Sequence, residues 1–204
     1  SVPLQTSAPA AQLAPIIDEV APTAFAVSID QLDTAVDAIA QGTAPERVVV
    51  FDYYPEDDDQ REAFEAARDR LPAGVVLESL IEVVERGSAG DPPPLFVPEE
   101  NDNPLATIFY TSGSTGAPKG AMYTERMLVT PWLPSTLLDR RHDETIPAIH
   151  INFMPMSHLY GRHWLAMTLA SGGTAYFAAK SDLSTLFDDI ASILEPIGGG
   201  AERA

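Results

Sequence analysis

Short apolar runs rich in branched residues alternate with stretches of helical spacing along most of this 204-residue chain. For example, Leu32, Val36 and Ile39 recur at helical spacing just before the strand-like run at 47–52. This alternation is typical of βα units, in which helices join covered parallel strands. We therefore predict an α/β fold of stacked βα units. The expected strands are residues 23–28, 47–52, 74–77, 105–110, 149–154 and 174–179.

Several expected helices carry signals for where they begin or bend. Asp30 can cap the helix that ends at Ile39, and Pro15 is expected to kink the first helix. The last helix has Ser181 or Asp182 available as its cap. Its apolar residues fall on one face: Leu183, Leu186, Phe187, Ile190, Ile193 and Leu194.

A connector divides the chain into parts. Residues 91–104 contain three consecutive prolines and an acidic stretch, which neither a helix nor a central strand accommodates. Residues 1–90 then form a first part rich in βαβ units, and residues 105–195 form a second part. Residues 196–204 read as a glycine-rich tail.

The most acidic spot is Glu56–Asp59, directly before the apolar face of an expected helix. Carboxylates at a helix start complement the helix dipole and the amide groups left free there. We therefore assign no metal to this run. His142, His150 and His163 lack metal-ligand spacing with nearby carboxylates, and the chain contains no cysteine, so we expect no structural metal and no disulfide.

Charge and hydropathy narrow the possible partners. A formal net charge of −18 repels nucleic acid and anionic membranes, so neither is expected as a partner. Residues 1–17 lack the basic start of a signal peptide, and serine and glycine interrupt the uncharged stretch 163–179. A cytoplasmic protein without a membrane span is the expectation.

The segment Tyr110–Gly120 carries the clearest chemical signal. It packs three glycines, four hydroxyl residues and one lysine into eleven positions after a hydrophobic strand. Glycines let the backbone amides turn toward an anion, hydroxyl groups donate further hydrogen bonds, and Lys119 adds a full positive charge. The composition suits phosphate. The candidate phosphate-binding residues are Thr111, Ser112, Gly113, Ser114, Thr115, Gly116 and Lys119.

A flexible Gly/Ser hairpin on the surface is the alternative interpretation of such a loop. The order of residues argues against it, although two familiar phosphate motifs also fail. Lys119 is followed by Gly120 and stands three residues after Gly116, which does not fit the Walker A pattern. The dinucleotide-binding glycine pattern fails as well.

Position for position, Tyr110–Gly120 resembles the phosphate loop of the acyl-adenylate-forming superfamily. That superfamily covers acyl-CoA ligases, luciferases, peptide-synthetase adenylation domains and carboxylic acid reductases. Flanking segments resemble the adenylation domains of carboxylic acid reductases in particular, over nearly the whole chain to about Ile193. These segments are residues 2–9, 48–52, 120–126, 152–162 and 173–184.

The resemblance implies a fold, a reaction and partners. The fold is part of the large N-terminal domain of an acyl-adenylate-forming enzyme. The loop would hold the β- and γ-phosphates of ATP while a carboxylic acid attacks the α-phosphorus, giving acyl-AMP and pyrophosphate. Mg²⁺ would arrive with ATP. The parent's carrier domain, with its phosphopantetheine thiol, and its NADPH-dependent reductase domain would complete the reduction to an aldehyde.

His158 corresponds to the histidine of the family's second core motif, beside the substrate carboxylate. Taken alone, such a histidine is more often structural. The resemblance makes Lys119 and His158 the candidate catalytic residues. The neighbouring Met154, Met156, Tyr160 and Trp164 are candidates for an apolar acid site, and each is equally compatible with plain core.

Several later motifs of the superfamily are absent, including the magnesium-binding glutamate motif and the C-terminal domain with its catalytic lysine. We therefore expect an excised fragment, inactive in isolation. Two alternatives stay open. One is a fragment of a fatty-acid or acyl-CoA ligase. The other is a folded module without turnover.

Overall fold

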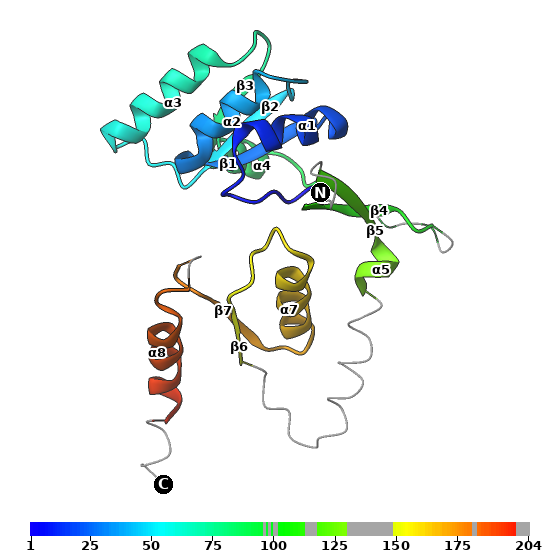
Figure 1. Ribbon diagram of the computed structural model, residues 1–204, viewed down its shortest axis with the longest axis vertical. Coiled ribbons are helices and arrows are strands. Elements are labelled where there is room, and N and C mark those ends of the chain that lie inside the picture. Colours follow the sequence, from blue (N-terminus) through cyan, green and yellow to red (C-terminus); the bar gives the residue numbers. More distant parts are fainter. Residues whose placement is uncertain are drawn as a thin grey trace. The chain divides into compact units, whose positions relative to one another are not determined.

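The computed structural model describes residues 1–95, 97, 99, 102–112, 118–129, 149–180 and 183–198. The chain divides into two compact units. One is Thr6–Val97, and the other joins Ser1–Gln5 to the part of the chain after residue 97. Figure 1 labels the helices and strands of both units. The predicted functional partition at residues 90, 104 and 195 stays a prediction.

A parallel three-stranded sheet forms the centre of the unit Thr6–Val97, in the order β1 (Ala24–Ser28), β2 (Arg47–Phe51), β3 (Val76–Ser79). Val48 pairs with Phe25 on one side and Leu77 on the other. Each strand follows the last through a helical crossover, so the predicted α/β fold of βα units is confirmed here.

One face of this sheet is covered by helices that precede or connect the strands. They are α1 (Ala10–Val20), α2 (Leu32–Ile39) and α3 (Asp58–Arg70). Val48 and Val50, two residues apart on β2, are fully buried on this face. The core also contains Ile17, Leu32, Val36 and Ile39, each at most 2% exposed. Arg70 forms ion pairs with Asp33 and Asp37, which tie α3 to α2.

The acidic run before α3 caps the helix as expected. The Asp57 carboxylate accepts hydrogen bonds from the amides of Asp59 (3.0 Å) and Gln60 (3.2 Å). The expected cap at Asp30 is wrong. Asp30 lies inside a short 3₁₀ helix, Ile29–Gln31, and no side chain caps that turn or α2. Ile29 and Leu32 are both buried, so the chain already turns inward before Asp30.

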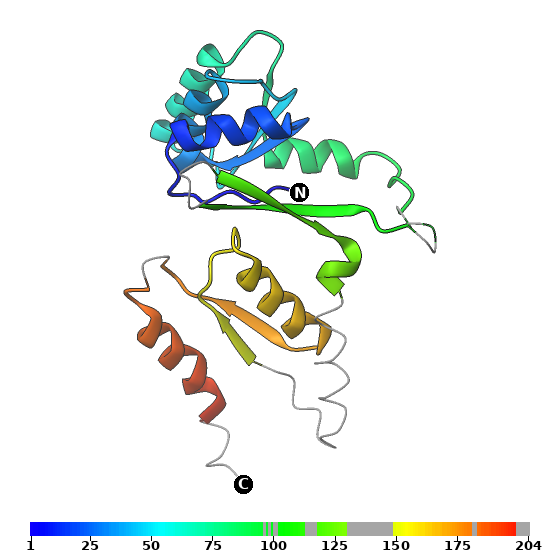
Figure 2. The same ribbon diagram turned by 45° about the vertical axis from the view of Figure 1, so that its right-hand side comes forward.

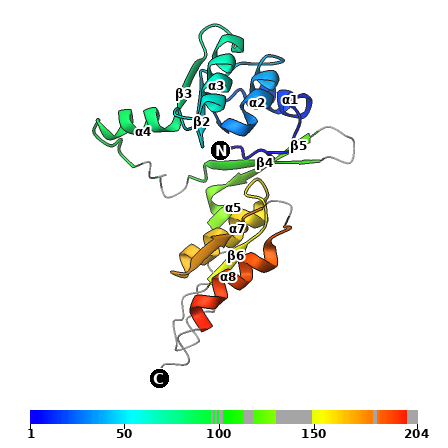
Figure 3. The same ribbon diagram turned by 90° about the vertical axis from the view of Figure 1, so that its left-hand side faces the viewer.

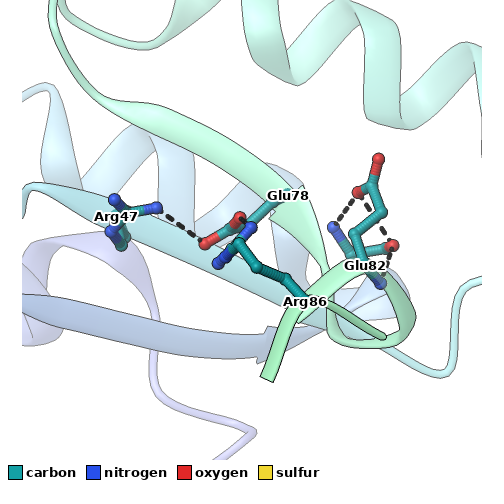
Figure 4. Close-up of polar contacts among 5 residues, drawn as sticks. Arg47, Glu78, Glu82 and Arg86 are labelled. Carbon is teal, nitrogen blue, oxygen red and sulfur yellow. Dashed lines mark hydrogen bonds and ion pairs between the residues drawn. The ribbon is translucent and has the colours of Figure 1, made fainter. Parts of the chain in front are cut away.

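Helix α4 (Leu80–Ser88) lies on the other side of the sheet (Figure 3). Glu78, only 7% exposed, pairs in register with Val49 and so points away from the face of Val48 and Val50. Its carboxylate forms ion pairs with Nη1 of Arg86 on α4 at 2.7 Å and with Nη1 of Arg47 on β2 at 3.1 Å (Figure 4). The start of α4 is closed by a capping box between Ser79 and Glu82.

The other unit begins with an antiparallel hairpin of β4 (Leu105–Ser112) and β5 (Pro118–Thr124), followed by α5 (Glu125–Val129). Figure 2 shows the two strands side by side. Ser1 lies along β4: its carbonyl accepts from the Ile108 amide at 2.9 Å, and its amino group donates to the Ala106 carbonyl at 2.8 Å. The sequence analysis did not anticipate β5.

The same unit contains two parallel strands, β6 (Ile149–Asn152) and β7 (Thr174–Phe177), joined through α7 (Leu159–Ala170). Both strands end two residues earlier than predicted, and the chain after β6 turns, with the His158 amide bonding the Pro155 carbonyl at 2.9 Å.

The last helix is α8 (Leu186–Gly198). Leu183 lies before α8 with a positive φ of 60°, so its predicted place on the helix is wrong. The expected caps, Ser181 and Asp182, lie outside the described residues. Helix α8 itself continues to Gly198, beyond the predicted start of the tail at residue 196.

Candidate functional site

Thr111 and Lys119 are direct cross-strand partners at the loop end of the β4–β5 hairpin. Residues opposite each other in an antiparallel pair have Cβ atoms roughly 5 Å apart on the same face of the sheet. Both residues are exposed. The hairpin therefore presents a hydroxyl group and an ammonium group side by side. Gly113, Ser114, Thr115 and Gly116 lie outside the described residues, and for Ser112 only the backbone, paired with Pro118, is described.

Gly120 makes room for an aromatic ring on the opposite face of the hairpin. A Cβ atom there would lie 2.8 Å from Ile108 Cγ2 and 3.1 Å from Tyr110 Cζ. Tyr110 is the cross-strand partner of Gly120, so its ring packs against the bare backbone. This packing lies one residue from the Thr111–Lys119 pair and supports the strand ends from which both residues project.

His158 is the N-cap residue of α7. Its Nδ1 atom accepts a hydrogen bond from the Tyr160 amide at 3.2 Å. Because an accepting Nδ1 carries no proton, the ring N–H of this imidazole is on Nε2. This contact leaves Nε2 as the ring nitrogen that can donate a hydrogen bond. Among the described residues, no hydrogen bond engages Nε2 of His158, so its N–H can donate to a carboxylate.

Asn152 and Gly161 fix the turn that carries His158. Asn152, 3% exposed, donates from Nδ2 to the Gly161 carbonyl at 2.9 Å and accepts from the Met154 amide at 3.2 Å. A Cβ atom at Gly161 would lie 2.5 Å from the Pro155 carbonyl oxygen. The turn can therefore approach α7 this closely only where the helix has a glycine. Sequence reasoning did not single out either residue.

Arg162 contacts both the turn before His158 and the hairpin. Its Nε donates to the Met156 carbonyl at 2.8 Å, and its Cζ lies 5.9 Å from the centre of the Phe109 ring. Phe109 is on β4 two residues before Thr111, hence on the same face of the hairpin. Arg162 thus lies between the two segments that the sequence analysis identified separately. Its importance also escaped sequence reasoning.

A cavity of about 650 Å³ lies between the hairpin and α7. This volume is within the range of small-molecule sites. Met156 and Tyr160, two of the four proposed acid-site residues, line it together with Leu159, Arg162 and Leu165. Met154 and Trp164 do not line it. Trp164 instead stacks on His150, with ring centres 5.0 Å apart.

The described part of the chain contains neither a metal-binding cluster nor a membrane-spanning helix. There, no three or more His, Cys, Asp or Glu side chains gather in a way that could hold a metal ion. Among the helices of the same residues, none combines the length and apolar character needed to cross a bilayer.

Comparison with known proteins identifies the family of this chain. The family model described as AMP-binding enzyme matches residues 1–193. This chain belongs to the AMP-binding enzyme family. Among curated relatives, the carboxylic acid reductase of Mycobacterium tuberculosis is 52% identical over 193 residues, and that of Mycobacterium marinum is 48% identical over 199 residues. Each alignment covers 95% of this chain and 16% of the relative.

Solved structures of family members extend the comparison to the fold. The A domain of the carboxylic acid reductase from Segniliparus rugosus, in complex with AMP and a co-purified carboxylic acid, matches with a TM-score of 0.77 at 43% identity. The match covers 93% of this chain and 30% of that one. The chain therefore has the fold of part of a carboxylic acid reductase adenylation domain, as the sequence analysis predicted.

Proposed function

We propose that this chain supplies the phosphate loop and part of the acid site of an adenylation domain that joins a carboxylic acid to AMP. Membership of the AMP-binding family supports the reaction class. The observation that carries the proposal is the pairing of Lys119 with Thr111 beside residues 113–117. In a chain of net charge −18, the described residues of this hairpin contain no acid, and Lys119 is their only charged side chain.

The donors on the hairpin fit a polyphosphate. Thr111 and Lys119 are exposed and lie on one face, so both can reach the same anion. We assign Ser112, Gly113, Ser114, Thr115 and Gly116 to the same phosphate contacts, with Mg²⁺ carried mainly by the phosphates of ATP.

In the proposed reaction a carboxylate oxygen forms a bond to the α-phosphorus of ATP. The bond from that phosphorus to the β-phosphate oxygen breaks, and its electron pair leaves with pyrophosphate. No proton transfer is required. Lys119 offsets the charge that grows on the departing pyrophosphate, and such placed charges supply much of the stabilisation in phosphoryl chemistry. His158 orients the attacking carboxylate through its Nε2–H.

The later steps belong to other domains. In a carboxylic acid reductase the acyl group passes to a phosphopantetheine thiol of a carrier domain, and NADPH then reduces the thioester. The A-PCP didomain of the Segniliparus rugosus enzyme, 45% identical to this chain over the matched region, supports such a carrier as partner. We propose a cytoplasmic location for the parent enzyme.

Two rival functions stand beside this proposal. The human long-chain-fatty-acid–CoA ligase 6 is 30% identical over 139 residues, which keeps an acyl-CoA ligase as the second candidate. The higher identity to carboxylic acid reductases favours the first. The other rival is a folded module that binds ATP without turnover in isolation.

Calorimetric titration with Mg-ATP tests the proposed phosphate grip. The wild-type chain is compared with Lys119→Ala and with Lys180→Ala. Lys180 is the only other lysine in the sequence, and it is also exposed. We expect saturable binding that Lys119→Ala abolishes and Lys180→Ala retains. Equal binding by all three proteins would refute the role of Lys119. Carboxylate-dependent exchange of labelled pyrophosphate into ATP then separates an active chain from a binding module.

A further inference from the structure

We propose that Arg162 is the anchor for the carboxylate group of the acid substrate, which it holds at the wall of the cavity between the β4–β5 hairpin and α7. The inference rests on the proposed function, because it names a residue for the second substrate of that reaction. It arises from three properties of Arg162: a fixed guanidinium group, unused donors, and a place in the wall of an apolar cavity.

The guanidinium group is fixed from two sides. Nε donates to the Met156 carbonyl at 2.8 Å, two residues before His158. The guanidinium carbon lies 5.9 Å from the centre of the buried Phe109 ring, within the range of a cation–π contact. Arg162 is itself half-buried. The long side chain is therefore ordered before any ligand arrives, which lowers the entropy cost of binding.

The two terminal nitrogens remain available. Within the described part of the chain, Nη1 and Nη2 of Arg162 have no hydrogen-bond or ion-pair partner, and the only bond of this side chain runs through Nε. A guanidinium with free terminal donors presents a planar fork that matches the two oxygens of a carboxylate. The half-buried guanidinium group of Arg162 can therefore take an anionic ligand as the partner of Nη1 and Nη2.

The surroundings favour a carboxylic acid over a free phosphate. Arg162 lines the 650 Å³ cavity together with Met156, Leu159 and Leu165, a wall suited to a hydrocarbon chain. The other polar residues on the wall are Ser1, Thr107, Tyr123, Glu125, Tyr160 and His163. None of the ion pairs of the described residues joins Glu125 to Arg162. An amphiphile with one anionic end therefore fits better than a wholly charged ligand.

The position of Arg162 also suits the reaction. Phe109, under the guanidinium, and Thr111 lie on the same face of β4 and are separated by one residue. Two residues of a strand span about 6.6 Å. The ring that Arg162 contacts therefore belongs to the next residue along β4 on the same face as Thr111.

The test compares two ligands of the same shape and different charge. Octanoate and octanamide are titrated separately into the wild-type chain, Arg162→Met, Arg162→Lys and Lys119→Ala. We expect the wild type to bind octanoate at least about tenfold more tightly than octanamide, the gain typical of a charge-assisted hydrogen bond. Arg162→Met should bind both ligands alike, and Arg162→Lys should keep part of the preference.

The ratio of the two affinities separates anchoring from a structural role. If Arg162 only stabilised the fold, its replacement would lower the affinities for octanoate and octanamide equally and leave their ratio unchanged. A wild type without preference for octanoate, or without binding of either ligand, overturns the inference. So does an unchanged preference in Arg162→Met.

Failure of the proposed function would give a different pattern of binding from failure of the carboxylate anchor. Lys119→Ala should keep the octanoate preference while losing Mg-ATP binding. If the wild type binds no Mg-ATP but shows an Arg162-dependent octanoate preference, the phosphate role fails and the carboxylate anchor stands. If Mg-ATP binds and the preference is absent, only the anchor fails.

Discussion

Lys119 lies directly opposite Thr111 across the β4–β5 hairpin, and both side chains point to the same face. An ammonium group and a hydroxyl group are thereby held at the end of two paired strands rather than on a free loop. Elements of regular structure hold donors more accurately than loops do. Ligand binding at this end should depend on each of the two side chains separately.

Replacement of Thr111 by valine tests the hydroxyl group. Valine keeps the β-branched shape and the strand preference, so stability should change little. We expect Mg-ATP affinity to fall about tenfold, as for loss of one hydrogen bond to a charged group. Thr174→Val, at an exposed position of β7, is the matched control and should leave the affinity unchanged. Calorimetry measures both, and equal affinities for the two variants would contradict the role of Thr111.

Gly161→Ala tests the close approach of α7 to the turn that carries His158. The added Cβ atom would meet two backbone oxygens, of Pro155 at 2.5 Å and Met154 at 2.8 Å, and neither can swing aside as a side chain can. We expect a loss of about 1–3 kcal/mol in unfolding free energy.

Gly87→Ala in α4 is the control for Gly161→Ala, since a Cβ atom at Gly87 meets no atom within 4 Å. The Gly87→Ala substitution should raise the unfolding free energy by about 0.5–1 kcal/mol, because alanine has a higher helix propensity than glycine. Chemical denaturation of both variants checks the pair, and a harmless Gly161→Ala would refute the steric argument.

Asp57→Ala tests the interpretation of the acidic run as a helix cap. Two backbone amides lose their acceptor, so we expect a loss of about 1 kcal/mol in stability. Asp59→Ala, on the first turn of the same helix, removes an equal charge without removing the cap and should cost less. Thermal unfolding with and without Ca²⁺ completes the test. A rise in Tm on adding Ca²⁺ to the wild type would instead indicate a metal site.

Glu78 should make stability depend on pH. The hydrogen bond from Arg86 holds the pKa of Glu78 below its ordinary value, burial opposes this, and Arg47 adds to the lowering. A carboxyl group whose pKa is lower in the folded state stabilises fully above its unfolded pKa and loses that contribution as pH falls through the folded value. Stability should therefore decline on acidification below about pH 4.5, with Glu82 contributing in the same direction.

Glu78→Gln should be less stable than wild type at pH 7 and show a shallower decline between about pH 5 and pH 3. Glu85→Gln, at an exposed position of α4, is the control and should follow the wild-type curve. Denaturant unfolding across this pH range measures both. An unchanged slope in Glu78→Gln would show that the network in Figure 4 does not govern the acid response.

Much of the fold could be predicted because its signals are local. The buried residues of α2 recur at helical spacing, and the capping carboxylate of α3 stands just before the helix that it caps. The failures also have local causes. Strand β5 follows directly on a glycine- and serine-rich segment that predicts a loop. Asp30 is a good cap by type, yet burial of Ile29 starts the turn one residue earlier.

The sequence by itself determined the helical and strand periodicities, the composition of the proposed phosphate loop, and the positions of Lys119 and His158 within recognisable segments. Only the tertiary structure decided which side chains meet: Thr111 with Lys119, Asn152 with Gly161, and Arg162 with Phe109. Local preferences depend on neighbours a few positions away, so they are readable along the chain. Contacts between distant residues depend on how whole elements pack, and no short segment contains that information.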